Sequence, residues 1–353
     1  MVSFKEVYFS DIQPDIQNFL LVGDIGGTNS NFGLFQWADN TWNIVHSFHV
    51  KTKQIDNFTR TVQDLYTYIQ QAFHITIQHA CFAGAGPVYP DRTQCTLTNA
   101  PITINAQELQ KALGISCVLI TNDFEVIGYG INCIATEKLI QVKEGEKYAQ
   151  ANKVYIGAGT GLGASVMHWD YGKNRYNAVT SEGGHADFSV QDEIELALVE
   201  FIRKTENRSC NVSWEDILSG AGIKRMYQFF KSRNHAVKSH RLLGSNGPEP
   251  DEIFNSKDMD DHARYTYELY AKLYGRFAKS SALASLSLGG LYIAGGIAAH
   301  NVPMFQSETF LQEFLNCGKQ QALLERISIT IVADYNVSLY GAAEYMRLED
   351  HCS

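Results

Sequence analysis

The sequence lacks the features that mark several large classes of protein. Its 29 Lys and Arg residues are outnumbered by 38 Asp and Glu residues, giving a formal net charge of −9. A nucleic-acid interface needs a basic stripe, so this balance argues against a nucleic-acid partner. The seven cysteines are scattered and never spaced as CxC or CxxC. No zinc site can therefore be recognised among them.

Long apolar runs are also scarce. Residues 280–301 contain no Asp, Glu, Lys or Arg, but Gly289 and Gly290 interrupt them. The end of a helix followed by a buried strand explains this stretch better than a membrane span does. Residues 1–18 are mixed polar and contain no apolar segment typical of a secretion signal. We therefore expect no membrane partner and a cytoplasmic location.

Two common phosphate-binding motifs are absent. A Walker A motif requires Gly-Lys followed by Ser or Thr, but Gly172-Lys173 is followed by Asn174. The dinucleotide motif GxGxxG requires a glycine at its sixth position. In GAGTGLG (157–163) that position holds Leu162. Neither a P-loop nor a dinucleotide-binding fold is predicted.

The length and the pattern of the chain predict two α/β domains. It has 353 residues, of which 45% are hydrophobic, so it is long enough for two domains with sizeable cores. The first half opens with a strand, a glycine-rich turn and a strand in LVGDIGGTNSNFGL (21–34), and residues 153–169 repeat this order. This weak internal symmetry indicates two related domains, preceded by a surface extension at 1–18.

Hydrophobic periodicity and capping residues predict the individual elements. Strands are expected at 19–25, 31–37, 43–50, 79–84, 93–98, 117–123, 153–156, 164–169, 291–295 and 327–333. Helices are expected at 57–73, 105–113, 191–203, 214–230, 260–286 and 336–347. The polar segment 231–259 is predicted to be a long surface loop.

The two glycine turns are candidates for binding a polyphosphate. In each turn glycines precede a threonine, as in Gly26-Gly27-Thr28 and Gly159-Thr160. Glycines let the backbone approach a ligand closely and aim N–H groups at an anion, and threonine adds a hydroxyl donor. Asp24 stands at the strand end before the first turn. The alternative is that both are ordinary hairpin turns.

Two polar segments, one between these turns and one after the second, are candidates for catalysis and sugar binding. In TNDF (121–124), Asn122 can hydrogen-bond a hydroxyl and Asp123 can accept its proton, as a general base must. Asn-Asp is equally a common helix start. In SEGGHADFS (181–189), Glu182 and His185 flank two glycines and can bind neighbouring sugar hydroxyls. The alternatives there are a metal site and a buried structural histidine.

Two further segments are weaker candidates for ligand binding. Ser213 with Asp216 is a capping box, which places Glu215 in the first turn of a helix. An acid at that position also simply suits the helix dipole. Gly295 and Gly296 in AGGIA (294–298) end a strand, where they let an adenine ring lie on the backbone or form a plain strand–loop turn.

Taken in order, these motifs resemble those of bacterial ATP-dependent glucokinases of the non-ROK type. The motifs are LVGDIGGTNSNFGL, LTNAP, ITNDF, GAGTGLG, SEGGH, EDILSG and AGGIA, from about residue 20 to about residue 346. The resemblance implies an α/β fold of two actin-like (ribonuclease H-like) domains around a central cleft. It implies a small domain at 19–121 plus 334–353 and a large domain at 122–333. A homodimer is also implied.

The resemblance further implies phosphorylation of the glucose 6-hydroxyl with ATP and Mg²⁺. Asp123 resembles the catalytic base. The residues that resemble sugar ligands are Asn99, Asn122, Asp123, Glu182, His185 and Glu215. Those that resemble nucleotide ligands are Asp24, Gly26, Gly27, Thr28, Asn29, Gly159, Thr160, Gly161, Gly295 and Gly296. Asp24 would hold Mg²⁺ through water.

The sequence departs from the family pattern beside the first turn. Where the family commonly has Ala-Arg, this chain has Ser30-Asn31, so a positive charge is missing at that place. Two other functions remain open. One is a kinase for another hexose or an amino sugar, with the same phosphate turns and different sugar contacts. The other is a non-catalytic sugar-binding regulator, which Asp123 argues against.

Overall fold

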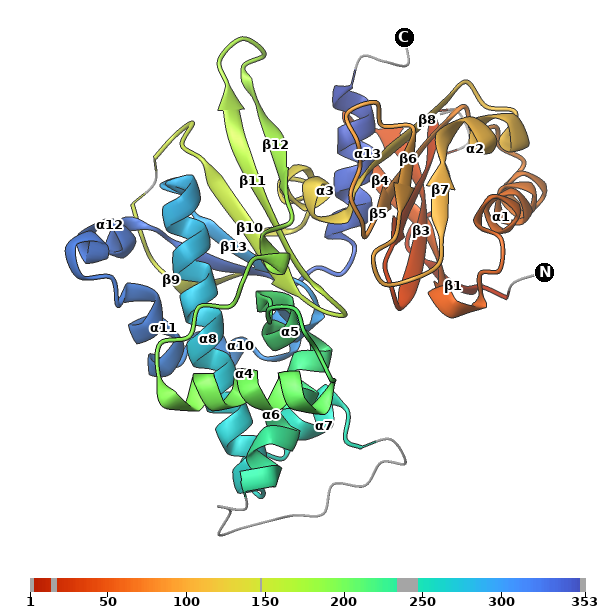
Figure 1. Cartoon of the computed structure of the whole chain (residues 1–353). Helices are drawn as coiled ribbons and strands as arrows, with labels where there is room; N and C mark the ends of the chain where they lie inside the picture. Colours follow the sequence, from red (N-terminus) through yellow and green to blue (C-terminus); the bar gives the residue numbers. More distant parts are fainter. Residues whose placement is uncertain (1–2, 14–17, 147, 234–246, 350–353) are drawn as a thin grey trace. The chain divides into compact units, whose positions relative to one another are not determined.

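The computed structural model describes residues 3–13, 18–146, 148–233 and 247–349 (Figure 1). The chain divides into two compact units. The first comprises Met1–Lys138, Ala178–Thr180 and Asp334–Ser353, and the second comprises Leu139–Asn177 and Ser181–Ala333. Each unit has its own six-stranded sheet and its own hydrophobic core.

The sheet of the first unit is mixed. Across the sheet its strands are β1 (Lys5–Tyr8), β4 (Thr41–Lys51), β3 (Asn29–Ala38), β2 (Phe19–Ile25), β5 (His79–Gly84) and β8 (Cys117–Asn122). The strands from β1 to β2 pair antiparallel, whereas β2, β5 and β8 pair parallel. The carboxyl ends of the three parallel strands therefore meet at one edge of the sheet.

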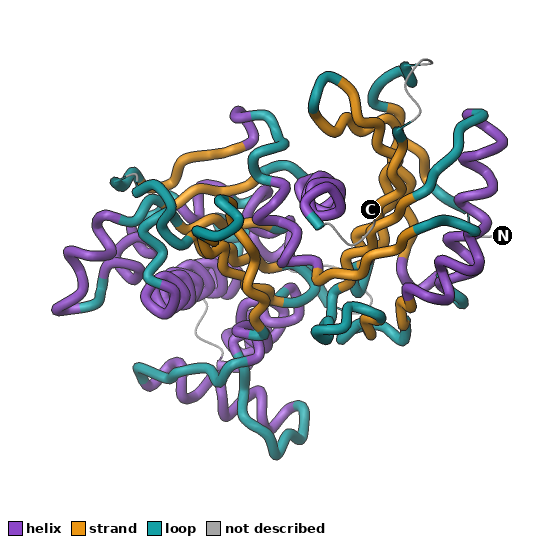
Figure 2. The backbone as a smooth tube through the Cα atoms, turned by 90° about the horizontal axis from the view of Figure 1, so that it is seen from above, coloured by secondary structure: helices purple, strands orange, loops and turns teal. Residues whose placement is uncertain are grey.

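Helices cover both faces of this sheet (Figure 2). Strand β2 is apolar on both sides, as a central strand between two helix layers must be. On one face α1 (Phe58–Phe73) and α2 (Ala106–Leu113) complete the core. On the other face lies α13 (Val337–Leu348), which contacts β2 and β5 and also packs against α3 (Asp123–Gly130).

The sheet of the second unit repeats the order of five strands of the first, from β4 to β8, but its sixth strand lies at the opposite edge and pairs antiparallel there. Its order is β12 (Arg175–Ser181), β11 (Leu162–Asp170), β10 (Lys153–Ala158), β13 (Leu291–Ala294), β14 (Ile329–Val332) and β9 (Leu139–Lys143). A glycine turn joins the antiparallel pair β10 and β11, and β10, β13 and β14 are parallel. The predicted internal symmetry is thus present in the topology of the two sheets.

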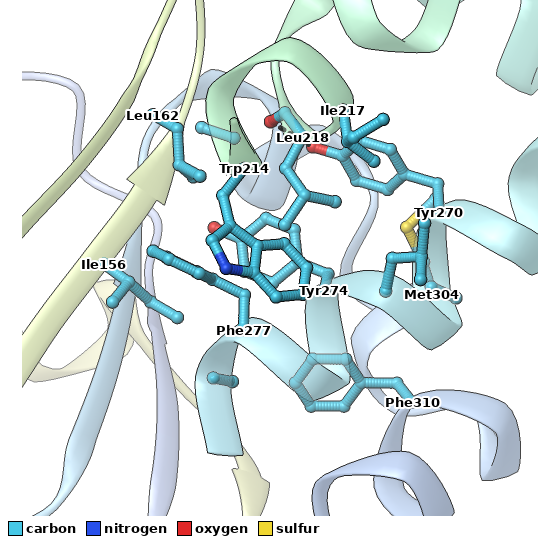
Figure 3. Packing of buried hydrophobic residues seen from close by; sticks show 14 of the residues in the cluster. Ile156, Leu162, Trp214, Ile217, Leu218, Tyr270, Tyr274, Phe277, Met304 and Phe310 are labelled. Atoms are coloured by element: carbon cyan, nitrogen blue, oxygen red, sulfur yellow. Dashed lines mark hydrogen bonds between the residues drawn. The ribbon is translucent and has the colours of Figure 1, made fainter. Parts of the chain in front are cut away.

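The helices of the second unit pack around a core rich in aromatic residues (Figure 3). They are α4 (Glu193–Thr205), α5 (Trp214–Leu218), α6 (Gly220–Arg233), α7 (Pro250–Asn255), α8 (Asp261–Ser285), α9 (Gly296–His300), α10 (Val302–Phe305), α11 (Glu308–Leu315) and α12 (Gln321–Arg326). Tyr270 of α8 donates a hydrogen bond to the Leu218 carbonyl oxygen (3.1 Å). This contact fixes α5 on the long helix.

The remaining elements are short. Strands β6 (Gln94–Thr96) and β7 (Thr103–Asn105) form a two-stranded antiparallel sheet. The 3₁₀ turns are η1 (Thr52–Gln54), η2 (Thr136–Lys138), η3 (Gly183–His185) and η4 (Gly318–Gln320). Of these, η1 and η3 lie next to candidate site residues.

Several expectations differ from the structure. The predicted helix 214–230 is two helices, because Ser219 is extended (φ −102°, ψ 175°) between α5 and α6. The described part of the expected extension at 1–18 adds strand β1 to the sheet, with Phe4 against Phe32 and Phe48. The first unit continues past the expected boundary at 121 to Lys138, because α3 packs on α13.

The predicted loop at 231–259 is another difference. It contains the end of α6 and the whole of α7, whose first residue is Pro250. Proline is favoured in the first turn of a helix, because it has no N–H to leave unpaired there. Residues 234–246 of that prediction lie outside the described residues.

Candidate active site

The first unit brings several predicted site residues to one edge of its sheet. Asp24 pairs with Ala83 across β2 and β5, and Gly84 pairs with Asn122 across β5 and β8. Adjacent strands lie about 4.8 Å apart, so β2 and β8 are separated by roughly 10 Å. Asp24, with its turn, and Asn122 with Asp123 therefore share the carboxyl edge, where open α/β sheets bind ligands.

The first glycine turn is held in shape by Thr52. The Gly26 N–H donates to the Asn29 carbonyl oxygen (2.9 Å) and closes the turn. Buried Thr52 donates its hydroxyl to the Gly26 carbonyl oxygen (2.7 Å) and its N–H to the Thr28 carbonyl oxygen (3.0 Å). Thr52 therefore binds two carbonyl groups of the turn, those of Gly26 and Thr28.

Asp24 lies at the start of this turn and contacts the C-terminal helix. Ser338 of α13 donates its hydroxyl to Asp24 Oδ2 (2.6 Å). Burial raises the pKa of the Asp24 carboxyl, and the Ser338 hydrogen bond opposes that rise. A partly buried carboxylate with few protein partners is suited to a hard cation that takes oxygen ligands.

Asn122 caps helix α3 and thereby positions Asp123. Its Oδ1 accepts from the N–H groups of Phe124 (2.9 Å) and Glu125 (3.2 Å), and its Nδ2 donates to the Gly86 carbonyl oxygen (3.1 Å). Asp123 is the first residue of α3, and its Oδ1 accepts from the Phe124 N–H (3.0 Å). The helix start that the sequence left as an alternative is therefore present, and it fixes the candidate base.

A buried ion pair supports the same helix start. Glu125 is only 1% exposed and completes the capping box of α3. Arg92 binds it through two hydrogen bonds of 2.7 and 2.9 Å, and the Thr121 hydroxyl donates to it at 2.6 Å. Glu125 therefore has its charge paired where burial would otherwise be costly.

Asn99 lies in an exposed loop after β6. The Thr98 N–H donates to the Ala85 carbonyl oxygen (3.0 Å), next to the Gly86 carbonyl that binds Asn122. The loop and the start of α3 are therefore joined through residues 85–86. No hydrogen bond within the described residues links the Asn99 side chain itself to Asn122 or Asp123.

The second unit brings the other two glycine segments together. Strands β10 and β13 run parallel with Gly157 opposite Ala294, so both segments follow the same edge. Gly159 N–H donates to the Gly161 carbonyl oxygen, and Gly220 N–H donates to the Gly159 carbonyl oxygen (both 2.9 Å). The bend at Ser219 that divides α5 from α6 allows this second contact.

Gly295 is required at its position. Its φ is +92°, and a side chain there would place Cβ 2.6 Å from the Ala158 carbonyl oxygen. The absence of a side chain therefore lets residues 295–296 approach the second glycine turn. Gly296 begins α9 and has open space around it.

Glu182, His185 and Glu215 form a cluster in the second unit. His185 Nε2 lies 3.8 Å from Glu182 Oε2 and 3.9 Å from Glu215 Oε2, too far for direct hydrogen bonds. Glu215 Oε2 accepts from the Leu162 N–H (2.9 Å), immediately after the second turn. These three polar side chains can therefore converge on one hydroxylated ligand.

The packing beneath this cluster explains its position. Trp214, which precedes Glu215, is buried in the core shown in Figure 3. Gly184 lies so close to Leu162 that any side chain would overlap the Leu162 carbonyl oxygen. His185, with 42% of its side chain exposed, is not the buried structural histidine that the sequence left open.

The described residues contain neither a cluster of metal ligands nor a membrane-spanning helix. Within the described ranges, no three His, Cys, Asp or Glu side chains gather as metal ligands. In the same part of the chain, no helix is both long enough and apolar enough to cross a membrane.

Solved structures identify the class to which this fold belongs. Glucokinase from an Antarctic psychrotroph has a TM-score of 0.76 at 25% identity, covering 94% of this chain and 99% of that one. Glucokinase from Balamuthia mandrillaris in complex with glucose has a TM-score of 0.79 at 21% identity, covering 94% of each chain. A ROK family glucokinase from Streptomyces griseus, in complex with glucose and AMPPNP, has a TM-score of 0.61 at 16% identity, covering 94% of this chain and all of that one.

These neighbours define a sugar kinase of the actin-like ATPase fold, which confirms the expected α/β fold class. The family model described as Glucokinase matches residues 21–349. Glucokinase from Nostoc punctiforme is 32% identical over 339 residues, covering 92% of this chain and 97% of that protein. The chain therefore belongs to the glucokinase family.

Sequence reasoning missed the residues that act through other residues. Ser338 is 314 positions from Asp24, and no local pattern connects them. Thr52 is an ordinary residue after a strand, and its role depends on tertiary contact with the first turn. The Arg92–Glu125 pair had one available signal, because Glu125 stands three residues after Asn122 as in a capping box.

Proposed function

We propose that this chain is an ATP-dependent glucokinase, transferring the γ-phosphoryl group of ATP to the 6-hydroxyl of glucose to give glucose 6-phosphate and ADP. Membership of the glucokinase family supports the reaction. The observation that carries the mechanism is the position of Asp123. It begins α3 at the sheet edge to which Asp24 and the first glycine turn also belong.

Asp123 is the proposed general base. A carboxylate can accept the proton of a hydroxyl as that hydroxyl attacks phosphorus. Asn122 and the Arg92–Glu125 pair hold the backbone on either side of Asp123, so its carboxylate is preorganised. In phosphoryl transfer the protein contributes mainly by positioning the reactants and stabilising charge, and does little covalent chemistry itself.

The proposed sugar ligands use hydrogen bonds to hydroxyl groups. In the second unit these are Glu182, His185 and Glu215, and in the first they are Asn99, Asn122 and Asp123. Asn122 uses one N–H of its Nδ2 on Gly86, which leaves the other N–H as a donor. Glucose bound to the Balamuthia mandrillaris neighbour supports this substrate class.

The proposed nucleotide ligands are the glycine segments. Gly26, Gly27, Thr28 and Asn29 would bind phosphate from the first unit; Gly159, Thr160, Gly161, Gly295 and Gly296 would contribute from the second. Their N–H groups suit developing negative charge on phosphate oxygens. AMPPNP bound to the Streptomyces griseus neighbour, which shares the fold, is consistent with ATP.

Asp24 fits a site for Mg²⁺. Its carboxylate lies beside the turn and has Ser338 as one hydrogen-bond donor. Mg²⁺ is usually held by one or two carboxylates together with phosphate and water, so a single carboxylate suffices. When bound, the ion would neutralise phosphate charge. Asp24 would orient it through water.

We also propose a cytoplasmic homodimer, on the basis of the family resemblance. The experiment that tests the function measures coupled ADP release with glucose, mannose, fructose and N-acetylglucosamine. We expect the highest kcat/KM with glucose and strict dependence on added Mg²⁺. Preference for another sugar would make the chain a kinase of different specificity. No ADP release with any sugar, despite sugar binding, would favour a regulator.

A further inference from the structure

One lysine, at the end of a neighbouring strand, contacts the first glycine turn. Lys51 ends strand β4, and its Cα pairs with that of Asn29, the first residue of β3. Its Nζ donates a hydrogen bond to Asn29 Oδ1 (2.8 Å). The next residue, Thr52, binds the Gly26 carbonyl oxygen and the Ser30 hydroxyl. Lys51 is therefore held at the turn by its own contact and by its neighbour's.

The charge of Lys51 is not neutralised by the protein. Among the residues that the structure describes, no carboxylate forms an ion pair with its ammonium group. Both Lys51 and Asn29 are exposed. An ammonium group carries three donors, and Asn29 takes only one of them. Two N–H donors with a full positive charge remain for a ligand.

The contact also determines what Asn29 can offer. Its acceptor Oδ1 is bound to Lys51, so the amide presents its two Nδ2 donors elsewhere. The N–H of Gly27, at the middle of the turn, has no partner in the described part of the chain. The turn therefore presents donors of three kinds: backbone amide, side-chain amide and ammonium.

We infer that Lys51 is a phosphate-binding residue of this enzyme, contacting the polyphosphate of the nucleotide together with the first glycine turn. The inference rests on the proposed function, because it assigns the ligand as a nucleotide. A donor-only group with net positive charge recognises an anion, and charge-assisted hydrogen bonds to phosphate are stronger than neutral ones. Lysine acts there as a point charge on a flexible stem.

The test compares Lys51→Gln with Lys53→Gln. Glutamine keeps a donor for Asn29 but removes the charge. Lys53 is a matched control, because it is also exposed and lies two residues further along in η1. AMPPNP binding is measured by calorimetry at two salt concentrations for both variants and for Lys51→Arg. Adenosine, which has no phosphate, is measured as a competitor, and glucose is titrated separately.

We expect Lys51→Gln to weaken AMPPNP binding about tenfold, as for loss of a hydrogen bond to a charged group. Adenosine and glucose binding should be unchanged, the salt dependence should decrease, and Lys51→Arg should restore most of the affinity. Less than a twofold effect on AMPPNP would overturn the inference. So would equal weakening in Lys53→Gln, or equal weakening of adenosine. If the wild-type chain binds glucose but no AMPPNP, the proposed function itself fails and the inference with it.

Discussion

Ser338 donates its hydroxyl to Asp24 Oδ2 at 2.6 Å, although the two residues are 314 positions apart in the chain. The contact joins the C-terminal helix α13 to the strand end that precedes the first glycine turn. Ser338 is itself nearly buried, so its hydroxyl position is fixed by packing. The last helix of the chain thus holds a candidate magnesium ligand in place.

The raised pKa of Asp24 predicts that its charge costs stability at neutral pH. The folded state binds the proton more tightly than the unfolded state does, so stability falls as pH rises from the unfolded pKa of about 4 through the folded one. Asp24→Asn should therefore have a Tm at pH 7 no lower than wild type. Its kcat/KM for ATP should fall on the order of a hundredfold, because a charge partner is lost. Thermal unfolding and steady-state kinetics check this; a lower Tm with normal kinetics would contradict it.

Removing the Ser338 hydroxyl should raise the pKa of Asp24 further, because that hydrogen bond favours the ionised form. In Ser338→Ala the acid side of the kcat/KM profile for ATP should move to higher pH. The destabilisation at pH 7 should be about 1.5–3 kcal/mol, as for a hydrogen bond to a charged group. In the Asp24→Asn background the same substitution should cost less. An unshifted pH profile would mean that the Ser338 hydrogen bond does not affect the pKa of the Asp24 carboxyl.

Arg92→Ala should destabilise the protein strongly. It leaves Glu125 buried without its partner, which typically costs about 3–5 kcal/mol, and Arg92 is partly exposed, so the lower value is expected. The double variant Arg92→Ala/Glu125→Gln should recover part of the loss, because no buried charge remains unpaired. Urea unfolding measures both. A change in the free energy of unfolding within about 0.5 kcal/mol for Arg92→Ala would contradict a stabilising role for the pair.

Gly295→Ala and Gly296→Ala compare a position that excludes a side chain with a neighbouring position that admits one. Gly295 has φ +92° and no room for Cβ, whereas Gly296 has open space. Gly295→Ala should cost about 1–3 kcal/mol, the usual range for a non-glycine residue in a sparsely populated backbone region. Gly296→Ala should leave Tm within a degree or two, as expected for a change of less than about 0.5 kcal/mol. Equal Tm values for the two variants would contradict the role of the Gly295 backbone.

His185→Ala should weaken glucose far more than ATP. His185 lies with Glu182 and Glu215, and a site built to bond hydroxyls loses affinity when one donor is removed. We expect the KM for glucose to rise at least tenfold, which corresponds to the loss of about one hydrogen bond to a charged or polar partner. The KM for ATP should stay within twofold of the wild-type value. Initial rates at varied glucose and ATP give both values. A parallel rise in the two would indicate that His185 only supports the fold.

Local patterns in the sequence predicted most elements of both sheets. Asn57 and Asn105 cap α1 and α2, and Gly114 ends α2 in the left-handed region. These features depend on neighbouring residues alone, so the chain reveals them directly. The glycine turns were also visible, because glycine and threonine repeat in the same order after a strand in both halves.

The rest depended on tertiary contacts that no local pattern encodes. The bend at Ser219 that divides the predicted helix 214–230 goes with a hydrogen bond from the Gly220 N–H to Gly159, in a different segment. Strand β1 forms only because β4 has an open edge. In the sequence, Lys51 is only a lysine at a strand end. Its position beside Asn29 depends on the register between two strands. The candidate site residues could be proposed from the sequence, but the residues that hold them in place could not.

The central claim is that Asp123 is the base that deprotonates the sugar hydroxyl, and Asp123→Asn tests it most directly. The substitution keeps the size of the side chain and its hydrogen bond to the Phe124 N–H but removes proton acceptance. General-base catalysis is typically worth about 10²–10⁴-fold, so kcat should fall by at least about a hundredfold. Calorimetric glucose titration of the same variant should give an affinity close to wild type, since an amide still binds the hydroxyl. A kcat within a few-fold of wild type would contradict the account and require another acid, such as Asp24 or Glu182, as the base.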